Sequence, residues 1–496
     1  MRKSGILMHI SSLPNSYGIG KMGKEAYAFV DFLKRSGQSY WQILPISPTS
    51  YGDSPYQSFS INAGNPYFID FETLEQEGYL KAEDYKDIKW GSDPSKVDYE
   101  TVYNETFKVL KKAHKRFRKI SEKAYIKFVL ENKEWVYDYA LFMSLKNAHG
   151  GKAWYEWEDG LKFCKPKAIK AARKDLAAEI DFWCFVQFKY FQQFKRLKKY
   201  ANENGIDIIG DIPIYVSYDS VEVWMTPQYF DLDKQKRPNE VAGCPPDAFS
   251  ADGQLWGNPL YRWDVMAREK YAWWIGRIKA ASEVYDVTRI DHFRGFESYY
   301  CIPYGAKTAR KGKWRKGPDI KLFKEVKKQL GDVRIIAEDL GFLTKKVVKM
   351  LEASGYPGMK VLEFGFDGDA SNPYLPHNYK STNSVCYTGT HDNETAAGWI
   401  KGCDAGTAAF CKQYLGLTND KYVPWALVRL CWASVCDTAI AQLQDILCLS
   451  NEARMNTPST LGGNWAWRLD DMSKLDDELI ERLYNLGRTY GRINKK

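Results

Sequence analysis

Acidic residues end several apolar runs of this 496-residue chain. Asp211 closes IDIIGD, Asp291 closes VTRID, Glu338 closes VRIIAE and Asp392 follows YTGTH. Carboxyl groups in pairs can cleave glycosidic bonds, one as an ionised nucleophile and the other as a protonated general acid. Taken singly, Asp211 could cap a turn and Asp392 a helix. Four acids on one rim would repel one another, which favours a functional interpretation of the set.

The segment VTRIDHFRG, residues 287 to 295, places Arg289 and Asp291 on one face of a strand, because alternate strand residues share a face. By itself this pattern indicates a salt bridge. The arginine would lower the pKa of Asp291 and keep a nucleophile ionised. Glu338 follows the apolar residues 335 to 337, which would raise its pKa and suit a general acid.

Eight short runs bounded by turn residues predict strands that could carry these acids. They are residues 5–10, 40–46, 206–212, 285–291, 333–339, 359–366, 384–390 and 437–446. Helical patterns such as 24–37 and 181–205 separate many of them, which indicates a parallel sheet. Eight α/β units predict a closed (β/α)8 TIM barrel, and the first turn, SSLPNSYGIG, lacks the GxGxxG of a dinucleotide-binding fold.

Two connections in this pattern are far longer than the usual few residues. Residues 71–200 are expected to form a mainly helical insertion after the second strand, and residues 214–284 a further insertion after the third. The second contains a Pro- and Gly-bearing stretch, 243–263, which we interpret as a lid loop. The expected organisation is one catalytic barrel over residues 1–496 with insertions.

Composition limits the function classes. The net charge of +9, from 71 basic and 62 acidic residues, is a modest excess over so long a chain. The basic stretch 107–120 has helical apolar spacing, so a solvated helix face is favoured over nucleic-acid contact, which stays a lesser hypothesis. Ten cysteines without CxxC pairs and the lack of a signal-like start or a run of about 20 apolar residues favour a cytoplasmic protein. Six histidines without an HExxH pattern make a zinc site unexpected.

The motifs RIDHFRG, IAEDLG and GTHDNET, in this order, carry a resemblance. Further matches are SPYQSFSINAGNP (54–66), GDIPIYV (210–216), GCPPDAFSADGQLWGNPLYRW (243–263) and GNWAWR (463–468). Over essentially the whole chain the sequence resembles the 4-α-glucanotransferases, also called amylomaltases or disproportionating enzymes, of the α-amylase superfamily. One departure is PST (458–460), where the family pattern leads us to expect Pro-Gly-Thr.

The resemblance implies residue roles. Asp291 would be the nucleophile, Glu338 the acid and then base, and Asp392 the stabiliser of the distorted sugar. The sugar-binding residues would be Ser54, Tyr56, Asp211, Asp247, Gln254, Trp256, Arg289, His292, His391 and Asn464. No metal or cofactor is implied. Tyr261 could join Tyr56 and Trp256 in an acceptor platform, although packing of Tyr261 and Trp263 within the loop is an equal alternative.

The implied function is that of a retaining transferase. It would move α-1,4-glucan segments from a maltooligosaccharide to the 4-hydroxyl of an acceptor through a covalent glucosyl-aspartate. A hydrolase with the same carboxylates and a catalytically silent glucan-binding protein are the alternatives. The expected partners are α-1,4-glucans and maltooligosaccharides, without nucleic acid or membrane, and the oligomeric state is left open.

Overall fold

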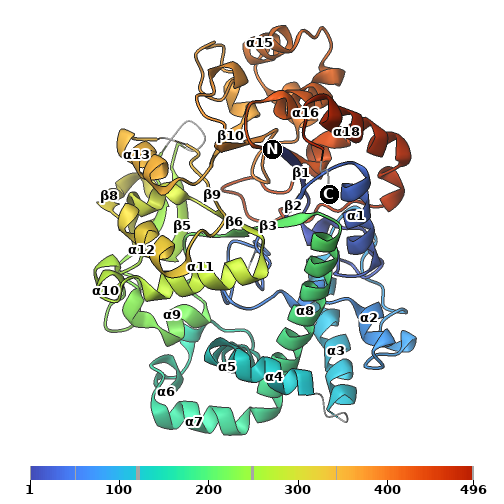
Figure 1. The fold of residues 1–496 in the computed structure, drawn as a ribbon. Helices are drawn as coiled ribbons and strands as arrows, with labels where there is room; N and C mark the ends of the chain where they lie inside the picture. Colours follow the sequence, from blue (N-terminus) through green and yellow to red (C-terminus); the bar gives the residue numbers. More distant parts are fainter. Residues whose placement is uncertain (1, 51, 119–122, 247–250, 342, 494–496) are drawn as a thin grey trace.

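The computed structural model describes residues 2–50, 52–118, 123–246, 251–341 and 343–493. Eight parallel strands at its centre follow one another in chain order (Figure 1). They are β1 (Lys3–Leu7), β2 (Tyr40–Gln42), β3 (Asp207–Ile212), β6 (Val287–Ile290), β9 (Ile335–Ala337), β10 (Gly358–Val361), β11 (Ser384–Tyr387) and β12 (Thr438–Gln442). The eight predicted runs each overlap one of these strands. The strands are shorter than the runs, mostly because the chain leaves the ladder at the carboxyl end to form a rim.

The two outermost strands of this sheet, β9 and β10, meet and close the barrel. The backbone N–H of Ala337 donates to the carbonyl oxygen of Pro357 at 2.9 Å. The N–H of Met359 donates to Oδ1 of Asp339 at 2.6 Å, so Asp339 joins the end of β9 to β10. The predicted (β/α)8 barrel is confirmed.

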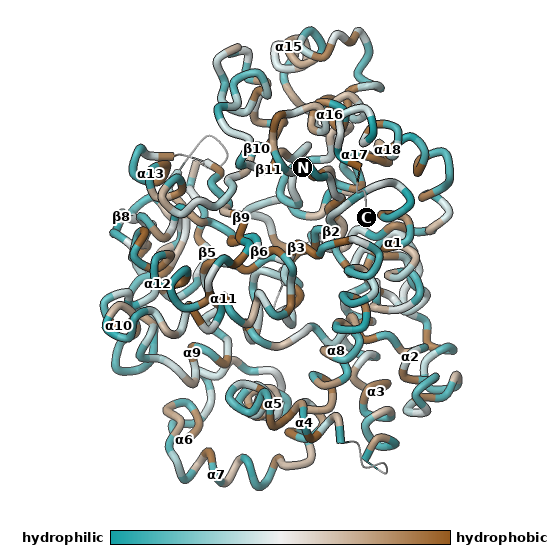
Figure 2. Tube along the Cα trace, in the orientation of Figure 1, coloured by the Kyte–Doolittle hydropathy of each residue, from teal (hydrophilic) through white to brown (hydrophobic). Residues whose placement is uncertain are grey.

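Helices cover the outside of the barrel, and the strands are therefore buried on both faces. The enclosing helices are α1 (Lys24–Arg35), α8 (Ala177–Glu203), α11 (Ala272–Val284), α12 (Ile320–Leu330), α13 (Lys345–Ser354), α16 (Val423–Ala433) and α18 (Asp477–Thr489). Figure 2 shows hydrophobic segments concentrated along the strands. In α8, where the sequence predicts a helix over 181–205, the apolar side chains of Phe185, Phe188, Phe194 and Leu197 are buried.

Residues 71–176 add further helices at one side of the barrel, the lower part of Figure 1. They are α2 (Phe71–Gln76), α3 (Tyr99–Phe117), α4 (Lys123–Glu131), α5 (Lys133–Ala148), α6 (Asp159–Lys162) and α7 (Pro166–Asp175). The basic residues of α3 pair with acids of the chain: Lys111 with Glu179 at 3.1 Å and Arg116 with Asp84 at 2.7 Å. This pairing supports the interpretation of α3 as a solvated helix.

A second sheet, which the sequence analysis did not predict, lies beside the barrel. It is antiparallel, in the order β5 (Gln254–Pro259), β4 (Glu240–Cys244), β7 (Ser298–Pro303), β8 (Lys313–Lys316). Strands from the connection after β3 thus pair with strands from the connection after β6. The short helix α9 (Val221–Met225) precedes β4 in the sequence, and α10 (Trp263–Arg268) follows β5.

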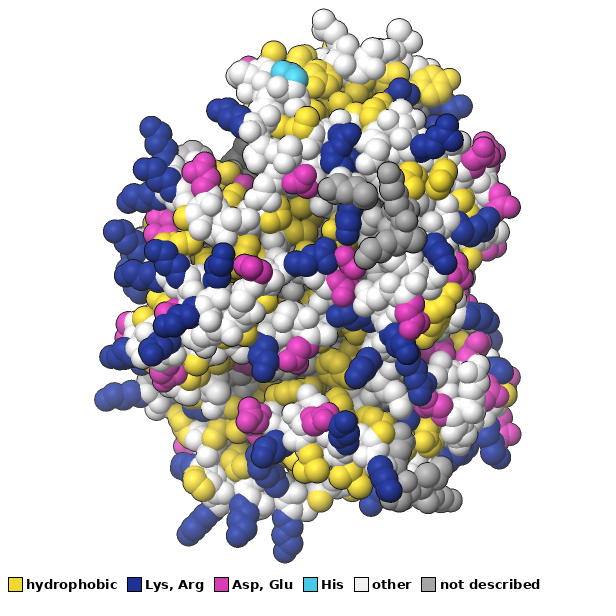
Figure 3. Space-filling view, viewed as in Figure 1, with side chains coloured by type: hydrophobic (Ala, Val, Ile, Leu, Met, Phe, Trp, Pro, Cys, Tyr) yellow, Lys and Arg dark blue, Asp and Glu magenta, His cyan; other side chains and the backbone are white. Residues whose placement is uncertain are grey.

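Three remaining helices of the described residues follow the last strands. They are α14 (Ala396–Gly402) and α15 (Ala405–Leu415) after β11, and α17 (Leu443–Ile446) after β12. No helix within the described ranges is long and apolar enough to cross a membrane. On the face drawn in Figure 3, lysine and arginine side chains are spread widely, with acidic side chains among them.

Candidate active site

Three of the predicted acids lie at the carboxyl ends of barrel strands. Asp291 follows β6 and Glu338 follows β9, and these strands are paired in register. The backbone N–H of His292 donates to Oε2 of Glu338 at 2.6 Å. Asp392 lies in the loop after β11, close enough for its charge to raise the pKa of Asp291. Asp291 and Glu338 thus come from adjacent strand ends, and neighbouring strands lie about 4.8 Å apart.

Arg289 joins two of the strand ends. It stands opposite Asp211 on the paired strands β6 and β3. One guanidinium nitrogen donates to Oδ2 of Asp211, and the other lies 3.2 Å from Oδ1 of Asp291. The hydroxyl of Tyr56 donates to the same Asp211 oxygen at 2.8 Å. The predicted pairing of Arg289 with Asp291 on one face is confirmed.

The pKa of Asp291 is raised to about 7. Burial is the main cause; the Arg289 guanidinium opposes it, while the negative charges of Glu338 and the other rim acids add to it. The expectation that Arg289 would bring this pKa below its usual range is therefore wrong. Arg289 lowers the pKa of Asp291, as predicted, but desolvation and the neighbouring negative charges raise this pKa by more.

Burial also raises the pKa of Glu338. Arg289 opposes this shift, as do the backbone N–H groups of Leu340 and His292, which donate to the two carboxyl oxygens at 2.9 and 2.6 Å. Two carboxylates on neighbouring strand ends repel each other, which together with burial favours a proton on one of them. That is the charge state that a nucleophile and a general acid share.

Asp392 differs from the other two acids. The surrounding protein partly desolvates it, which would raise its pKa, but His391, the Asn456 amide and Arg289 lower the pKa to about 2. Nδ2 of Asn456 donates to Oδ1 at 2.6 Å, and Nε2 of His391 lies 3.4 Å from Oδ2. Arg454 donates to the backbone carbonyl of Asp392 at 2.8 Å. Asp392 is therefore ionised, and its side chain, 47% exposed, is open to a ligand.

Aromatic rings form a wall beside these acids. Tyr56 stacks on His391 with centroids 5.0 Å apart, and Trp465 lies 5.8 Å from each ring. Tyr56 and His391 were predicted site residues. Trp465 was missed although it lies within GNWAWR, a motif already noted. Asn456 was also missed, because no spacing or strand pattern singles it out.

The described part of the predicted lid loop, which includes β5, reaches the same site. The ring of Trp256 meets His292 edge-on, with centroids 4.9 Å apart at 88°. Its Nε1 donates to Oε1 of Gln254 at 3.0 Å, so Gln254 holds the ring of Trp256. Asp247, another predicted lid residue, lies outside the described residues. Trp256 therefore sits over the residue that follows Asp291.

The packing alternative for Tyr261 and Trp263 is the correct one. Both are buried, with 2% and 9% of their surface exposed. The hydroxyl of Tyr261 donates to the carbonyl oxygen of Ile214 at 2.8 Å. The ring of Tyr215 stacks on the ring of Tyr261, with centroids 5.8 Å apart. Tyr261 therefore does not offer a free ring face to an acceptor sugar.

Two further predicted residues bond to their own loops. Oγ of Ser54 accepts the N–H of Tyr56 at 3.2 Å, and Oδ1 of Asn464 accepts that of Thr457 at 2.9 Å. Each thereby shapes a loop that carries Tyr56 or Asn456. In the latter loop Ser459 has φ +64°, a conformation that favours glycine, which accounts for the Pro-Gly-Thr expected there.

Known proteins are similar to this chain in sequence and in fold. A model of the family described as 4-alpha-glucanotransferase matches residues 8–474. A 4-alpha-glucanotransferase of Clostridium butyricum is 48% identical, covering 98% of this chain and 100% of the relative, and one of Thermus thermophilus is 47% identical, covering 94% and 95%. The solved structure of an amylomaltase from Streptococcus agalactiae, in complex with acarbose, has a TM-score of 0.97 at 43% identity and covers 100% of both chains. This chain belongs to the 4-α-glucanotransferase family.

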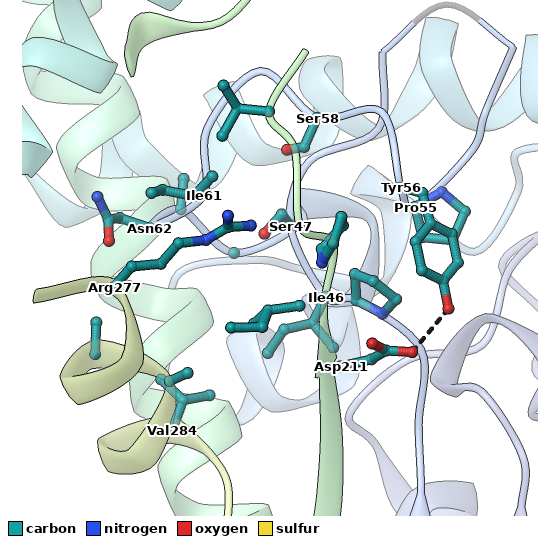
Figure 4. A pocket seen from close by; sticks show the side chains of 18 of the residues that line it. Ile46, Ser47, Pro55, Tyr56, Ser58, Ile61, Asn62, Asp211, Arg277 and Val284 are labelled. Atoms are coloured by element: carbon teal, nitrogen blue, oxygen red, sulfur yellow. Dashed lines mark hydrogen bonds between the residues drawn. The ribbon is translucent and has the colours of Figure 1, made fainter. Parts of the chain in front are cut away.

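A small cavity in this glucanotransferase lies behind Asp211. It has a volume of about 60 Å³ and is lined by the end of β3, α11 and the segment 45–64. Figure 4 shows Tyr56 and Asp211 at one end and Arg277 at the other. Asp211 Oδ1 and Arg277 Nε have no hydrogen-bond partner among the described residues. The lining does not include the three carboxylates, and a polar space of this size suits a few waters.

Proposed function

We propose that this 4-α-glucanotransferase transfers α-1,4-glucan segments between maltooligosaccharides with retention, through a glucosyl ester on Asp291. The observation that carries the proposal is the position of Asp291 and Glu338 on adjacent, paired strand ends. Retaining enzymes need their two carboxyl groups only about 5–5.5 Å apart, whereas inverting enzymes leave room for a water between them. The complex of the Streptococcus agalactiae relative with acarbose supports an α-glucan ligand.

In the first step the Asp291 carboxylate attacks C1 of the donor glucose unit. The bond from C1 to the glycosidic oxygen breaks, and Glu338 gives its proton to that oxygen. The released chain leaves with a free 4-hydroxyl, and the donor segment remains as an ester of Asp291. The single proton shared by the two buried carboxyl groups suits this division of roles.

In the second step Glu338, now ionised, accepts the proton of an acceptor 4-hydroxyl. The acceptor oxygen attacks C1, and Asp291 leaves as a carboxylate. Asp392 is ionised and accessible, so it stabilises the positive charge that develops on the sugar in both steps. His391 and Asn456 orient its carboxylate.

The remaining predicted residues would bind the sugars around this centre. Tyr56 and Trp256 offer aromatic faces, on which sugar rings stack. Polar contacts would come from Asp211, Arg289, His292, His391, Ser54, Gln254, Asn464 and the lid residue Asp247. Transfer requires that an acceptor sugar, not water, meets the ester. Trp256, seated on His292, is placed to cover the ester and exclude water.

We further propose that the enzyme works in the cytoplasm on glucans made or imported there. All ten cysteines are free, and so many unpaired thiols in one chain suit a reducing compartment. The exposed side chain of Cys448 would otherwise be open to oxidation.

Product analysis with pure maltotriose tests the activity. Glucose together with maltotetraose and longer chains is expected, because transfer conserves the number of glycosidic bonds. Maltose and glucose alone would identify a hydrolase and overturn the proposal.

Two substitutions test the residue roles. Asp291→Asn should lower kcat by about 10³-fold or more, because it removes the nucleophile. Glu338→Gln should lose activity on maltotriose but recover most of the ester-forming step with an α-maltosyl fluoride donor, since fluoride leaves without a proton. Wild-type turnover by either variant on maltotriose would show that the roles are wrongly assigned.

A further inference from the structure

The loop that carries His391 and Asp392 is tied down by two buried acids outside the mechanism. Asp445, in α17 after β12, has none of its surface exposed. Its Oδ2 accepts the hydroxyl of Thr388 at 2.6 Å, and its Oδ1 accepts the N–H of Ala396 at 2.7 Å. Asp445 therefore holds both ends of the loop from 388 to 396.

The second acid, Glu363, reaches the middle of the loop. It follows β10 and is 8% exposed. Its carboxyl group and the side chain of Asn393 both lie against Gly389, and the Asn393 amide opposes the rise in the pKa of Glu363. Oδ1 of Asn393 in turn accepts both the N–H and the hydroxyl of Thr390, each at 2.9 Å. Since Thr390 and Asn393 bracket His391 and Asp392, this chain of contacts sets where the two site residues lie.

The fit of Glu363 against the loop depends on Gly389. A Cβ at that position would lie 2.9 Å from Oε1 of Glu363 and 2.8 Å from Nε2 of Gln442, closer than such atoms approach. Glycine thus lets the loop backbone close onto the carboxyl group. Gly389 and Asn393 both belong to the GTHDNET motif. In the structure, both lie next to the carboxyl group of Glu363.

The charges around Glu363 favour its neutral form. It is buried beside the acids Asp445 and Glu394, with Arg454 as the opposing cation, and its pKa is raised well above the usual value. Its Oε1 has no hydrogen-bond partner among the described residues. A buried carboxylate with an unpaired oxygen is far costlier than a carboxylic acid.

We infer that Glu363, acting through Asn393, is a positioning residue that holds the loop of Asp392 in its working geometry. This inference rests on the proposed role of Asp392 in stabilising the transition state. Asp392 is half exposed, so the direct contacts of Asn456 and Arg454 cover only part of it, and the loop supplies the rest of its support. A loose loop would weaken contacts made in the transition state more than the binding of the ground-state sugar.

Substitutions at Glu363 and Asn393 test the inference with maltotriose as substrate. Glu363→Gln keeps a neutral group of the same shape, so kcat should stay within about twofold of the wild-type value. Glu363→Ala and Asn393→Ala should each lower kcat at least tenfold and change KM less than threefold. Because both break one chain of contacts, their double variant should lose little more than either alone.

A matched control and a reference variant complete the test. Asp84→Ala removes a buried carboxylate that accepts the N–H of Lys81 and pairs with Arg116 in the helical insertion; it should lower the thermal midpoint without changing kcat. Wild-type kcat in Asn393→Ala, or a tenfold loss in folded Glu363→Gln, would overturn the inference. Asn393 is a loop residue, so its variant decides the matter even if Glu363→Ala does not fold. Wild-type kcat in Asp392→Asn would instead refute the proposed function.

Discussion

At the scale of the residue, Arg289 sets the electrostatics of the site. Its planar guanidinium reaches Asp211 and Asp291 on neighbouring strands at once. A lysine offers one ammonium and cannot span both carboxylates in this way. Arg289 thereby links Asp291 to the buried Asp211. Its positive charge also offsets part of the rise in the pKa of Asp291 that burial causes.

Arg289→Lys should move the acid limb of the pH profile of kcat/KM to higher pH. Asp291 must be ionised to attack, so activity rises with pH through its pKa of about 7. A lysine would pair with the buried Asp211 and would no longer reach Asp291. Without this nearby positive charge, the pKa of Asp291 should rise by about one unit. The pH dependence of kcat/KM with maltotriose measures the shift.

The control for this prediction is Arg334→Lys. Arg334 pairs with Asp207 at 2.8 Å and bonds the Tyr40 hydroxyl at 2.9 Å at the amino ends of the strands, so its loss should leave the acid limb in place. An unmoved limb in Arg289→Lys would contradict the role given to Arg289.

At the scale of the element, the antiparallel sheet gives the lid a rigid base. Trp256 lies on β5, which pairs with β4, and not in a free loop. Its carbonyl oxygen also accepts from Nε2 of Gln57, at 3.4 Å. A paired strand restricts the position of its side chains more than a loop does, so the indole of Trp256 has a defined position over His292.

Trp256→Ala should raise the share of donor that is lost to water by several-fold. Removing the indole opens the ester to solvent, while the carboxylates are untouched. Transfer leaves the number of reducing ends unchanged and hydrolysis adds one per cleavage, so a reducing-end assay against total cleavage gives the ratio. Leu255→Ala is the matched control, since Leu255 is exposed on the same strand. An unchanged ratio in Trp256→Ala would refute the lid's role.

At the scale of the whole molecule, hydrogen bonds connect the two ends of the chain at the amino ends of the barrel strands. Arg492 follows α18 and has none of its surface exposed. Its guanidinium donates to the carbonyl oxygens of Lys3 on β1 at 2.9 Å, of Ser434 at 2.8 Å and of Cys436 at 2.9 Å. The last helix thus secures the first strand and the entry to β12.

Arg492→Ala should lower the free energy of unfolding by about 3–5 kcal/mol. Several buried carbonyl groups would lose a charged donor, and each bond of this kind contributes about 1.5–3 kcal/mol. The urea midpoint measures the effect, and kcat at low urea should not change. Arg488→Ala, which removes an exposed arginine of α18, should leave the midpoint unchanged. A urea midpoint of Arg492→Ala equal to that of the wild type would show that these hydrogen bonds do not contribute to stability.

Much of this molecule follows from local patterns. The eight strands, the helix α8 and the acids at the strand ends were all predictable, because apolar runs and their boundaries are properties of a few consecutive residues. The antiparallel sheet was not, since β4 pairs with β7 across more than 50 residues and neither strand has a strong period of its own.

The sequence by itself determined which acids end the barrel strands and that Arg289 shares a face with Asp291, because strand periodicity acts at short range. Only the tertiary structure decided that burial outweighs Arg289 at Asp291, that Tyr261 packs inside, and that Asn456 and Glu363 support Asp392. These outcomes depend on desolvation and on contacts between distant segments, and both arise only when the chain closes on itself.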